Sequence, residues 1–355
     1  MEAQSRERLG AHILGSLMAA ALGDAMGAAT EQHTIEEIVA TYGGLLRELH
    51  VPSRQTFSYG NIAGEVTDDV SQMFALADEL IKHDGKLTAE AWVARLIHWS
   101  QTSKHRQQMG PTTRPLLEAL AAGQDTSTIG RSPYSERKLT SFGTTNGAAM
   151  RIAPAGLVFP GDIERAVELA WITARPTHDT QIAMAGAGAI AAGVAHALTP
   201  GADVYSVTRA CLAGARLGEA IGVREGRRVA GPSIVRRIEI AVEEALRAPD
   251  LHAAIVAIEA TVGNSVMTVE SVPAAVGVFV AAGGNVLDTV SAGASIGNDS
   301  DTIAAMAGSL AGALHGIAGV PSDLAAQVRA ANDVDIDALA AGLTALAWRT
   351  IEEAA

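Results

Sequence analysis

The chain has 355 residues, of which 69 are Ala, 36 are Gly and only 18% are charged. This composition is too apolar for a disordered chain, and a net charge of -13 excludes the basic face that duplex nucleic acid requires. A single cysteine, Cys211, excludes a disulfide framework and favours a reducing, cytoplasmic setting.

Helical patterns fill most of the chain, and aromatic residues make up only 4% of it, so closely approaching helices have to form the core. Helices are expected, in chain order, at residues 8–28, 69–83, 88–101, 163–174, 180–198, 204–221, 234–247, 251–262, 271–282, 286–296, 302–317 and 336–353. No strand-like alternation persists. The sequence therefore predicts an all-α fold, with one multi-helix domain over residues 1–355.

Two polar segments, residues 43–66 and 103–145, interrupt the helical pattern with Gly, Pro, Ser and Thr. Both are expected to be long loops, which usually carry function when they occur in a compact domain. No linker or charge block divides the chain, and no fixed period indicates a repeat protein.

Two apolar runs raise the question of a membrane segment. Residues 11–22 follow an acidic flank that does not suit a signal peptide. Residues 303–320 are long enough to span a bilayer and carry three glycines spaced four apart. Acidic groups before this run and His315 within it favour a buried helix, so no membrane association is expected.

Two acidic clusters, Thr67–Asp69 and Asp299–Thr302, each open an apolar helix. Like charges at the edge of a core repel, and a helix N-terminus offsets only about 0.3–1 kcal/mol of this cost. A bound hard cation offsets far more, and carboxylate and hydroxyl oxygens suit Mg²⁺ or Mn²⁺. Ordinary helix capping is the alternative, but two such clusters favour a pair of metal ions.

The order and spacing of five motifs resemble those of the ADP-ribosylglycohydrolases. The motifs are Gly23-Asp24-Ala25-Met26-Gly27 with Glu31, Thr67-Asp68-Asp69, the run from Asn146 to Pro154, Thr177-His178-Asp179, and the run from Gly297 to Thr302. The resemblance covers nearly the whole chain and implies an all-α fold, a binuclear Mg²⁺ centre and hydrolysis of a ribosyl bond at C1. The metal ligands that it implies are Thr67, Asp68, Asp69, Asp299, Asp301 and Thr302. Glu31 is the candidate general base, or else a carboxylate that exchanges with substrate at the metal; an ordinary acid near a helix N-terminus in residues 30–38 is the alternative interpretation. Asp69 is a second candidate catalytic carboxylate.

Candidate substrate contacts come from the middle of the chain. The sequence predicts a turn at Asn146 and Gly147, followed by Ala148 and Met150. The small residues in this segment let a ligand approach the backbone closely. Tight helix packing is the alternative reading of this turn. His178 is expected to bind substrate or a metal-bound carboxylate, or else to be a core or capping histidine.

The chain departs from the family at three points. Val70 stands where family members often carry a Thr after Asp69, so one supporting hydroxyl is absent, and Asn298 stands where Gly is usual. Residues 104–114 stand where members that act on ADP-ribose carry a glycine-rich loop around the diphosphate, although Gly110, Thr112, Thr113 and Arg114 can still bind an anion. The substrate is therefore either an ADP-ribosylated molecule or a smaller ribosylated or nucleoside-like one.

Further residues have expected supporting roles. Asp24 is expected to cap its glycine turn or to support the metal ligands from behind, and Arg151 to pair with a buried acid. Tyr59, Tyr134 and Phe142 lie in the long loops, where a ring can stack on a base.

Two other functions compete with a Mg²⁺-dependent ribosyl hydrolase. An isoprenoid synthase needs a third acid after Asp68 and Asp69 and a pocket lined with aromatic residues, which this sequence lacks. A non-catalytic, crystallin-like relative has no need of the retained aspartates, which are costly to bury without a cation. The hydrolase is therefore the leading hypothesis.

Overall fold

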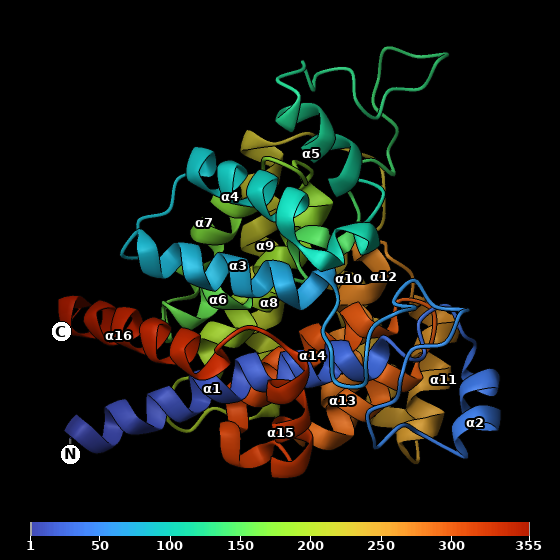
Figure 1. Ribbon diagram of the computed structural model, residues 1–355, viewed down its shortest axis with the longest axis vertical. Helices are drawn as coiled ribbons and strands as arrows, with labels where there is room; N and C mark the ends of the chain where they lie inside the picture. The colour runs from blue at the N-terminus through green and yellow to red at the C-terminus, as the bar shows by residue number, and fades with distance from the viewer. Residues whose placement is uncertain (1, 355) are drawn as a thin grey trace.

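Sixteen α-helices and three short 3₁₀ helices account for most of residues 2–354, the part of the chain that this computed structural model describes (Figure 1). Within that part the only β pairings are three isolated bridges, so the all-α prediction is confirmed. The helices are α1 (Glu2–Gly27), α2 (Ile35–Tyr42), α3 (Asp68–Lys82), α4 (Ala89–Thr102), η1 (Lys104–Gln108), α5 (Thr113–Ala121), η2 (Asn146–Ala148), α6 (Ala153–Leu157), α7 (Ile163–Ala174), α8 (Gln181–Ala197), α9 (Val204–Glu225), α10 (Ile234–Arg247), α11 (Leu251–Val262), α12 (Thr268–Ala281), α13 (Val286–Ser295), α14 (Ser300–His315), η3 (Ile317–Gly319), α15 (Ser322–Ala331) and α16 (Ile336–Ala354).

Every helix expected from the sequence is present, but the short helices α2, α5 and α6 were not predicted. The reading of 103–145 as one loop was wrong, because η1 and α5 interrupt it. In α5, Leu116 and Leu117 are buried and supply an apolar face too short to stand out beside Gly110 and Pro111. Only the part after α5 projects from the helical body (Figure 1).

Glycines let α1 and α14 cross with their backbones in contact. A Cβ atom on Gly308 would collide with the carbonyl oxygen of Ala19, and one on Gly312 with that of Gly15. The four-residue spacing of these glycines therefore serves close packing inside the protein. The same requirement explains why the chain is rich in Ala and Gly.

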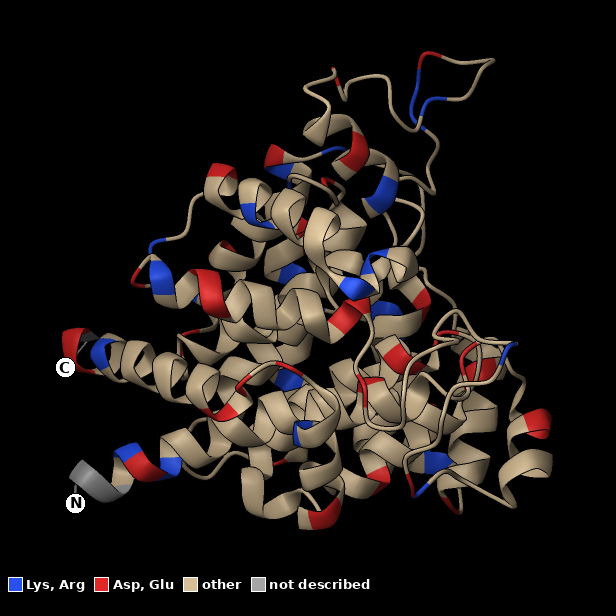
Figure 2. Cartoon of the chain, viewed as in Figure 1, with Lys and Arg blue, Asp and Glu red and all other residues tan. Residues whose placement is uncertain are grey.

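The apolar length of α1 belongs to the core. Among the described residues, Ser5–Gly27 is the one helical stretch long and apolar enough to cross a membrane, and 78% of its apolar window is buried inside the structure. The run 303–320 is not a continuous helix, because α14 ends at His315. Charged residues are scattered over the outer helices in the view of Figure 2, without a continuous basic face.

The end of α1 joins the beginnings of α3 and α14. A Cβ atom on Gly27 would collide with the backbone of Asp301, so α1 meets the first turn of α14 at backbone distance. Asp24, one turn earlier, accepts hydrogen bonds from the amides of Thr67 and Val70 at the start of α3. The three helix ends are thereby fixed relative to one another.

Replacing Gly308 with Ala is expected to lower the free energy of unfolding by about 1–3 kcal/mol, because the added methyl group overpacks a backbone contact. Gly10→Ala is the matched control, since the nearest atoms to its new Cβ are those of Thr344 at 3.5 Å. That control should be neutral or stabilising by up to about 1 kcal/mol, because Ala is the better helix former. Urea unfolding followed by circular dichroism measures both; equal effects would contradict the packing argument.

Candidate functional site

Both acidic clusters lie at helix N-termini that open into one cavity. Thr67 is the N-cap of α3, and its Oγ1 accepts the amide hydrogen of Asp69 at 3.3 Å. Asp299 is the N-cap residue of α14, and Asp301 lies in the first turn of that helix. The expectation that each cluster opens a buried helix is therefore confirmed.

The cavity has a volume of about 340 Å³. Acidic residues and one threonine form one part of its wall, namely Glu31, Asp68, Asp69, Asp299, Asp301 and Thr302. The rest of the wall comes from four segments. The segment from η1 to the start of α5 contributes Gln107, Gln108, Met109, Gly110, Pro111, Thr113 and Arg114. The segment around η2 contributes Thr145, Asn146, Gly147 and Met150, and the loops after α2 and α11 contribute Phe57 and Val266.

Asp24 supports the site from behind, as expected. It is fully buried, and its Oδ2 accepts the amide hydrogens of Thr67 at 2.9 Å and Val70 at 3.3 Å. These bonds satisfy two amides that the first turn of α3 leaves unpaired. The other oxygen of Asp24, Oδ1, is buried without a hydrogen-bond partner.

Burial and mutual repulsion raise the pKa values of the whole acidic group. Burial is the first cause in each case, and it raises the pKa of Asp301 to about 6, of Asp24 to about 7 and of Asp299 to about 8. The negative charge of Asp301 acts on its neighbours as the second cause, and the pKa of Glu31 rises to about 10. Burial followed by the same charge raises the pKa of Asp69 well above its usual range. The charge of Asp301 therefore acts on five other carboxyl groups, those of Asp24, Glu31, Asp68, Asp69 and Asp299.

The chemistry of these residues fits a hard divalent cation. The donors are carboxylate and hydroxyl oxygens, and the Oδ2 atom of Asp69 is buried without a hydrogen-bond partner. Within residues 2–354, no three His, Cys, Asp or Glu side chains are arranged so that they could hold a metal ion as they stand. The fit therefore rests on the donor types, on the unpaired oxygen and on the charge that a cation would offset.

Asn146 lies on the cavity wall, but its side chain is committed to the acidic cluster. Its Nδ2 donates to Asp299 Oδ2 at 2.6 Å and to Ser271 Oγ at 2.9 Å. This amide holds Asp299 in position, which is a different role from the substrate contact that the sequence suggested. Gly147 and Met150 line the cavity as expected.

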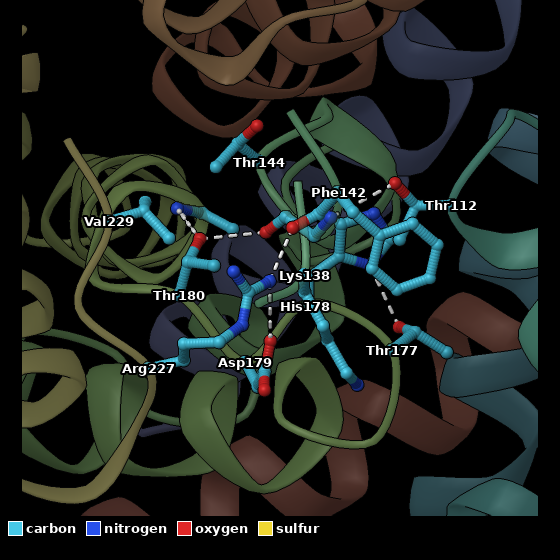
Figure 3. Close-up of polar contacts among 12 residues, drawn as sticks. Thr112, Lys138, Phe142, Thr144, Thr177, His178, Asp179, Thr180, Arg227 and Val229 are labelled. Carbon is cyan, nitrogen blue, oxygen red and sulfur yellow. Dashed lines mark hydrogen bonds and ion pairs between the residues drawn. The ribbon is translucent and has the colours of Figure 1, made fainter. Parts of the chain in front are cut away.

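His178 and Thr112 are absent from the cavity lining, contrary to the expectation that they contact substrate, and His178 is a core histidine, which was the alternative. Figure 3 shows the polar contacts around both residues. His178 is fully buried, and both ring nitrogens are hydrogen-bonded, to Thr177 and to Thr145. Thr112 Oγ1 accepts hydrogen bonds from Thr145 and from the amide of Gly143. These two side chains support the wall because their polar atoms already have partners inside the protein.

Ala148 and Thr67 also lie outside the cavity lining, as do the rings chosen for stacking. Ala148 is buried in the core, and a Cβ atom on its neighbour Gly147 would lie 2.8 Å from Cε1 of His178. The small residues at this turn therefore make room for the His178 ring. The three rings expected to stack on a base are absent from the lining, and Tyr134 is 96% exposed.

Sequence reasoning missed Phe57, which lines the cavity although 65% of the residue is exposed. Its neighbours Thr56 and Ser58 are buried, so the turn holds the Phe57 ring outward between two anchored residues. The polar composition of 43–66 predicted a functional loop but gave no signal for which of its rings faces the site. Gln107, Met109 and Val266 were also missed, because the composition of their own segments does not indicate which side chains face the cavity.

The comparisons with known proteins agree with this architecture. The sequence profile of the ADP-ribosylglycohydrolase family matches residues 4–352. An uncharacterized protein of Escherichia coli K12, YegU, is 30% identical over 334 residues, which are 93% of this chain and 96% of that protein. An uncharacterized protein of Archaeoglobus fulgidus is 30% identical over 301 residues, covering 84% of this chain and 85% of that protein.

A solved structure shares the fold. It is described as an ADP-ribosylglycohydrolase-related protein complex, with a TM-score of 0.68 and 23% sequence identity. The alignment covers 96% of this chain and 99% of the other. The family profile extends over almost all of the chain, including every motif of the acidic site, and the chain therefore belongs to the ADP-ribosylglycohydrolase family.

Proposed function

We propose that this protein is a divalent-metal-dependent hydrolase that cleaves the C1 glycosidic bond of a ribosyl group. The observation that carries the proposal is the convergence of four aspartates and Glu31 on one cavity, at the N-termini of α3 and α14. Membership of the ADP-ribosylglycohydrolase family supports the reaction class. The lack of other cysteines beside the buried Cys211 favours a cytoplasmic setting.

The proposed metal ligands are Thr67, Asp68, Asp69, Asp299, Asp301 and Thr302. Mg²⁺ or Mn²⁺, as a pair, would supply Lewis acidity toward the ribose hydroxyls and the attacking water. Thr67 is the weakest of these ligands, because its oxygen already accepts the amide hydrogen of Asp69. Asp69 is the strongest, because its Oδ2 has no partner within the protein.

Glu31 is the proposed general base. Its carboxyl group lies on the cavity wall, near the hydroxyl of Ser58 at 3.5 Å, and takes the proton of the water that attacks C1. Without a cation the pKa of Glu31 is about 10, and the carboxyl group is protonated at neutral pH; bound metal ions would offset the charges of the neighbouring aspartates, lower this pKa and leave Glu31 as the carboxylate that accepts the proton. The surrounding acids favour the positive charge that develops on the ribose ring in an oxocarbenium-like transition state.

A smaller, nucleoside-like substrate is the second candidate, and the wall formed by residues 104–114 favours it. This wall contributes Gln107, Met109 and Pro111, which are not suited to wrap a diphosphate. In the described part of the chain, Arg114 is the only Lys or Arg on the cavity wall, and its guanidinium is already hydrogen-bonded to the carbonyl of Gln107.

Asp301→Asn is expected to reduce hydrolysis by at least about 100-fold, because the loss of a ligand costs no less than the loss of a residue that supports one. Chelation by EDTA should have the same effect, with recovery on adding Mg²⁺ or Mn²⁺. Asp323→Asn is the matched control, since Asp323 is an exposed acid in the first turn of α15. Full activity in EDTA would rule out the metal-dependent mechanism.

The stability of the metal-free protein should fall as the pH rises from about 4 to 8. Asp24, Asp299 and Asp301 have folded-state pKa values above the usual 3.8, so the folded state binds more protons than the unfolded state in that window. The melting temperature in EDTA should therefore be lower at pH 8 than at pH 5, by about 5 °C or more. Mg²⁺ should raise it more at pH 8. Asp301→Asn should flatten this pH dependence; an equal slope in both proteins would contradict the carboxylate argument.

A hydrolysis screen distinguishes the two substrate classes. It compares ADP-ribosyl-arginine, ADP-ribosyl-serine and O-acetyl-ADP-ribose with simple nucleosides, and it measures released ADP-ribose or ribose. The altered wall predicts that nucleosides are cleaved at least about 10-fold faster, which corresponds to about 1.4 kcal/mol. Arg114→Gln should raise KM only for substrates that carry phosphate. Faster cleavage of the ADP-ribose conjugates would assign the larger substrate.

A further inference from the structure

A chain of buried hydrogen bonds links the metal-ligand candidate Asp68 to Arg151. Gln72 Nε2 donates to Asp68 Oδ2 at 3.0 Å, and Gln72 Oε1 accepts from Arg151 Nη1 at 2.8 Å. Arg151 Nη2 donates to Thr177 Oγ1 at 2.9 Å. The expectation that Arg151 pairs directly with an acid was wrong, because Gln72 lies between the guanidinium and the carboxylate.

The same chain continues from Thr177 to His178 (Figure 3) and from there to the cavity wall. Thr177 Oγ1 lies 2.8 Å from His178 Nδ1, and His178 Nε2 lies 2.9 Å from Thr145 Oγ1. Thr145, a wall residue, donates to Thr112 Oγ1 at 3.0 Å. Thr112 immediately precedes α5, which begins with the wall residues Thr113 and Arg114.

The hydroxyl of Thr145 fixes the direction of these hydrogen bonds. Its single proton is donated to Thr112, so its oxygen accepts the hydrogen of His178 Nε2. The neutral His178 ring then accepts at Nδ1 from the hydroxyl of Thr177, whose oxygen in turn accepts from Arg151. Burial, followed by the charge of Arg151, keeps the pKa of His178 well below its usual range, which agrees with a neutral ring.

Arg151 is held rigidly in this hydrogen-bond chain, between Gln72 and Thr177. It is fully buried, its guanidinium lies 5.4 Å from the ring centroid of Trp92, and Nη2 also reaches the carbonyl of Thr173 at 3.4 Å. Burying the Arg151 guanidinium costs free energy of folding, because it is fully desolvated and linked to Asp68 only through Gln72.

The segment after Thr177 anchors the end of the long loop as well (Figure 3). Thr180 Oγ1 donates to the carbonyl of Gly143 at 2.7 Å, and the Gly143 amide donates to Thr112. Arg227 donates to the carbonyl of Phe142 and lies 3.3 Å from Asp179. Consecutive residues at this turn therefore hold the wall from behind without touching the cavity.

We propose that Arg151 is a positioning residue that orients two parts of the active site at once. Through Gln72 it orients Asp68, and through Thr177 and His178 it orients Thr145. The inference rests on the proposed function, in which Asp68 binds the metal and Thr145 faces the substrate. It predicts that the two branches can be broken separately, with different consequences.

Two near-isosteric variants break one branch each. Gln72→Met removes the link to Asp68 and is expected to weaken Mn²⁺ binding about 10-fold by titration calorimetry, with KM at saturating metal unchanged. Thr177→Val removes the link to His178 and is expected to raise KM severalfold for the nucleoside or ADP-ribose conjugate that the screen identifies, with Mn²⁺ affinity unchanged. In Thr177→Val, ¹⁵N NMR should show a shifted His178 Nδ1 resonance, because this nitrogen loses its hydrogen bond, whereas Thr177→Ser should keep the wild-type resonance.

Thr173→Val is the matched control. Thr173 is also buried and lies four residues earlier, near the end of α7, and its hydroxyl donates to the carbonyl of Ala170. This variant should match the wild type in Mn²⁺ affinity, KM and the His178 spectrum. Wild-type Mn²⁺ affinity in Gln72→Met, or identical behaviour of Thr177→Val and Thr173→Val, would overturn the proposal. Absence of Mn²⁺ binding in the wild type would overturn the proposed function instead, and the His178 spectrum would still test the second branch.

Discussion

Repulsion among buried carboxylates is the constraint on which the rest of the structure depends. Asp24, Asp68, Asp69, Asp299 and Asp301 are all buried, and each would gain free energy by moving into water or away from the others. Two helix N-termini offset part of the cost, and Asp24 receives two amide hydrogens. The rest of this free-energy cost remains in the folded protein, so the helices that carry the carboxylates have to be held rigidly.

That stiffness explains the unusual composition. Where α1 crosses α14, glycines on both helices let the two backbones come into contact, and no flexible side chain lies between them. Gly23 and Gly27 lie in this contact, whereas Asp24 lies between them in sequence and binds the start of α3. The first family motif therefore connects three helices. Its glycines allow α1 to approach α14 closely, and its aspartate binds the backbone amides at the start of α3. A larger residue at either glycine would move the acids apart.

The acidic site could be predicted from the sequence because its signals are local: paired acids before an apolar helix are costly wherever that helix is packed. For Asp24 the sequence left two roles open, capping of its glycine turn or support of the acids from behind, and its bonds to the start of α3 agree with the second. The positions of Phe57 and His178 could not be predicted, because they depend on which way a loop turns and on which hydroxyl lies opposite. Asn298 is understood only with the structure, since its φ of 53° is left-handed and Asn tolerates that conformation better than most residues.

The chemistry and the specificity of this site are built from different parts of the chain. The acids are carried by core helices that cannot shift without breaking backbone contacts, whereas the facing wall comes from loops and the short helix α5. A change of sequence in residues 104–114 would therefore alter the cavity wall and leave the acids in place. In the proposed reaction the two parts also need a fixed relation, because the bond at C1 has to lie within reach of both. The hydrogen bonds between Asp68 and Thr112 connect them through groups that solvent does not reach, so the wall can diverge in sequence while its anchor points stay where the acids require them.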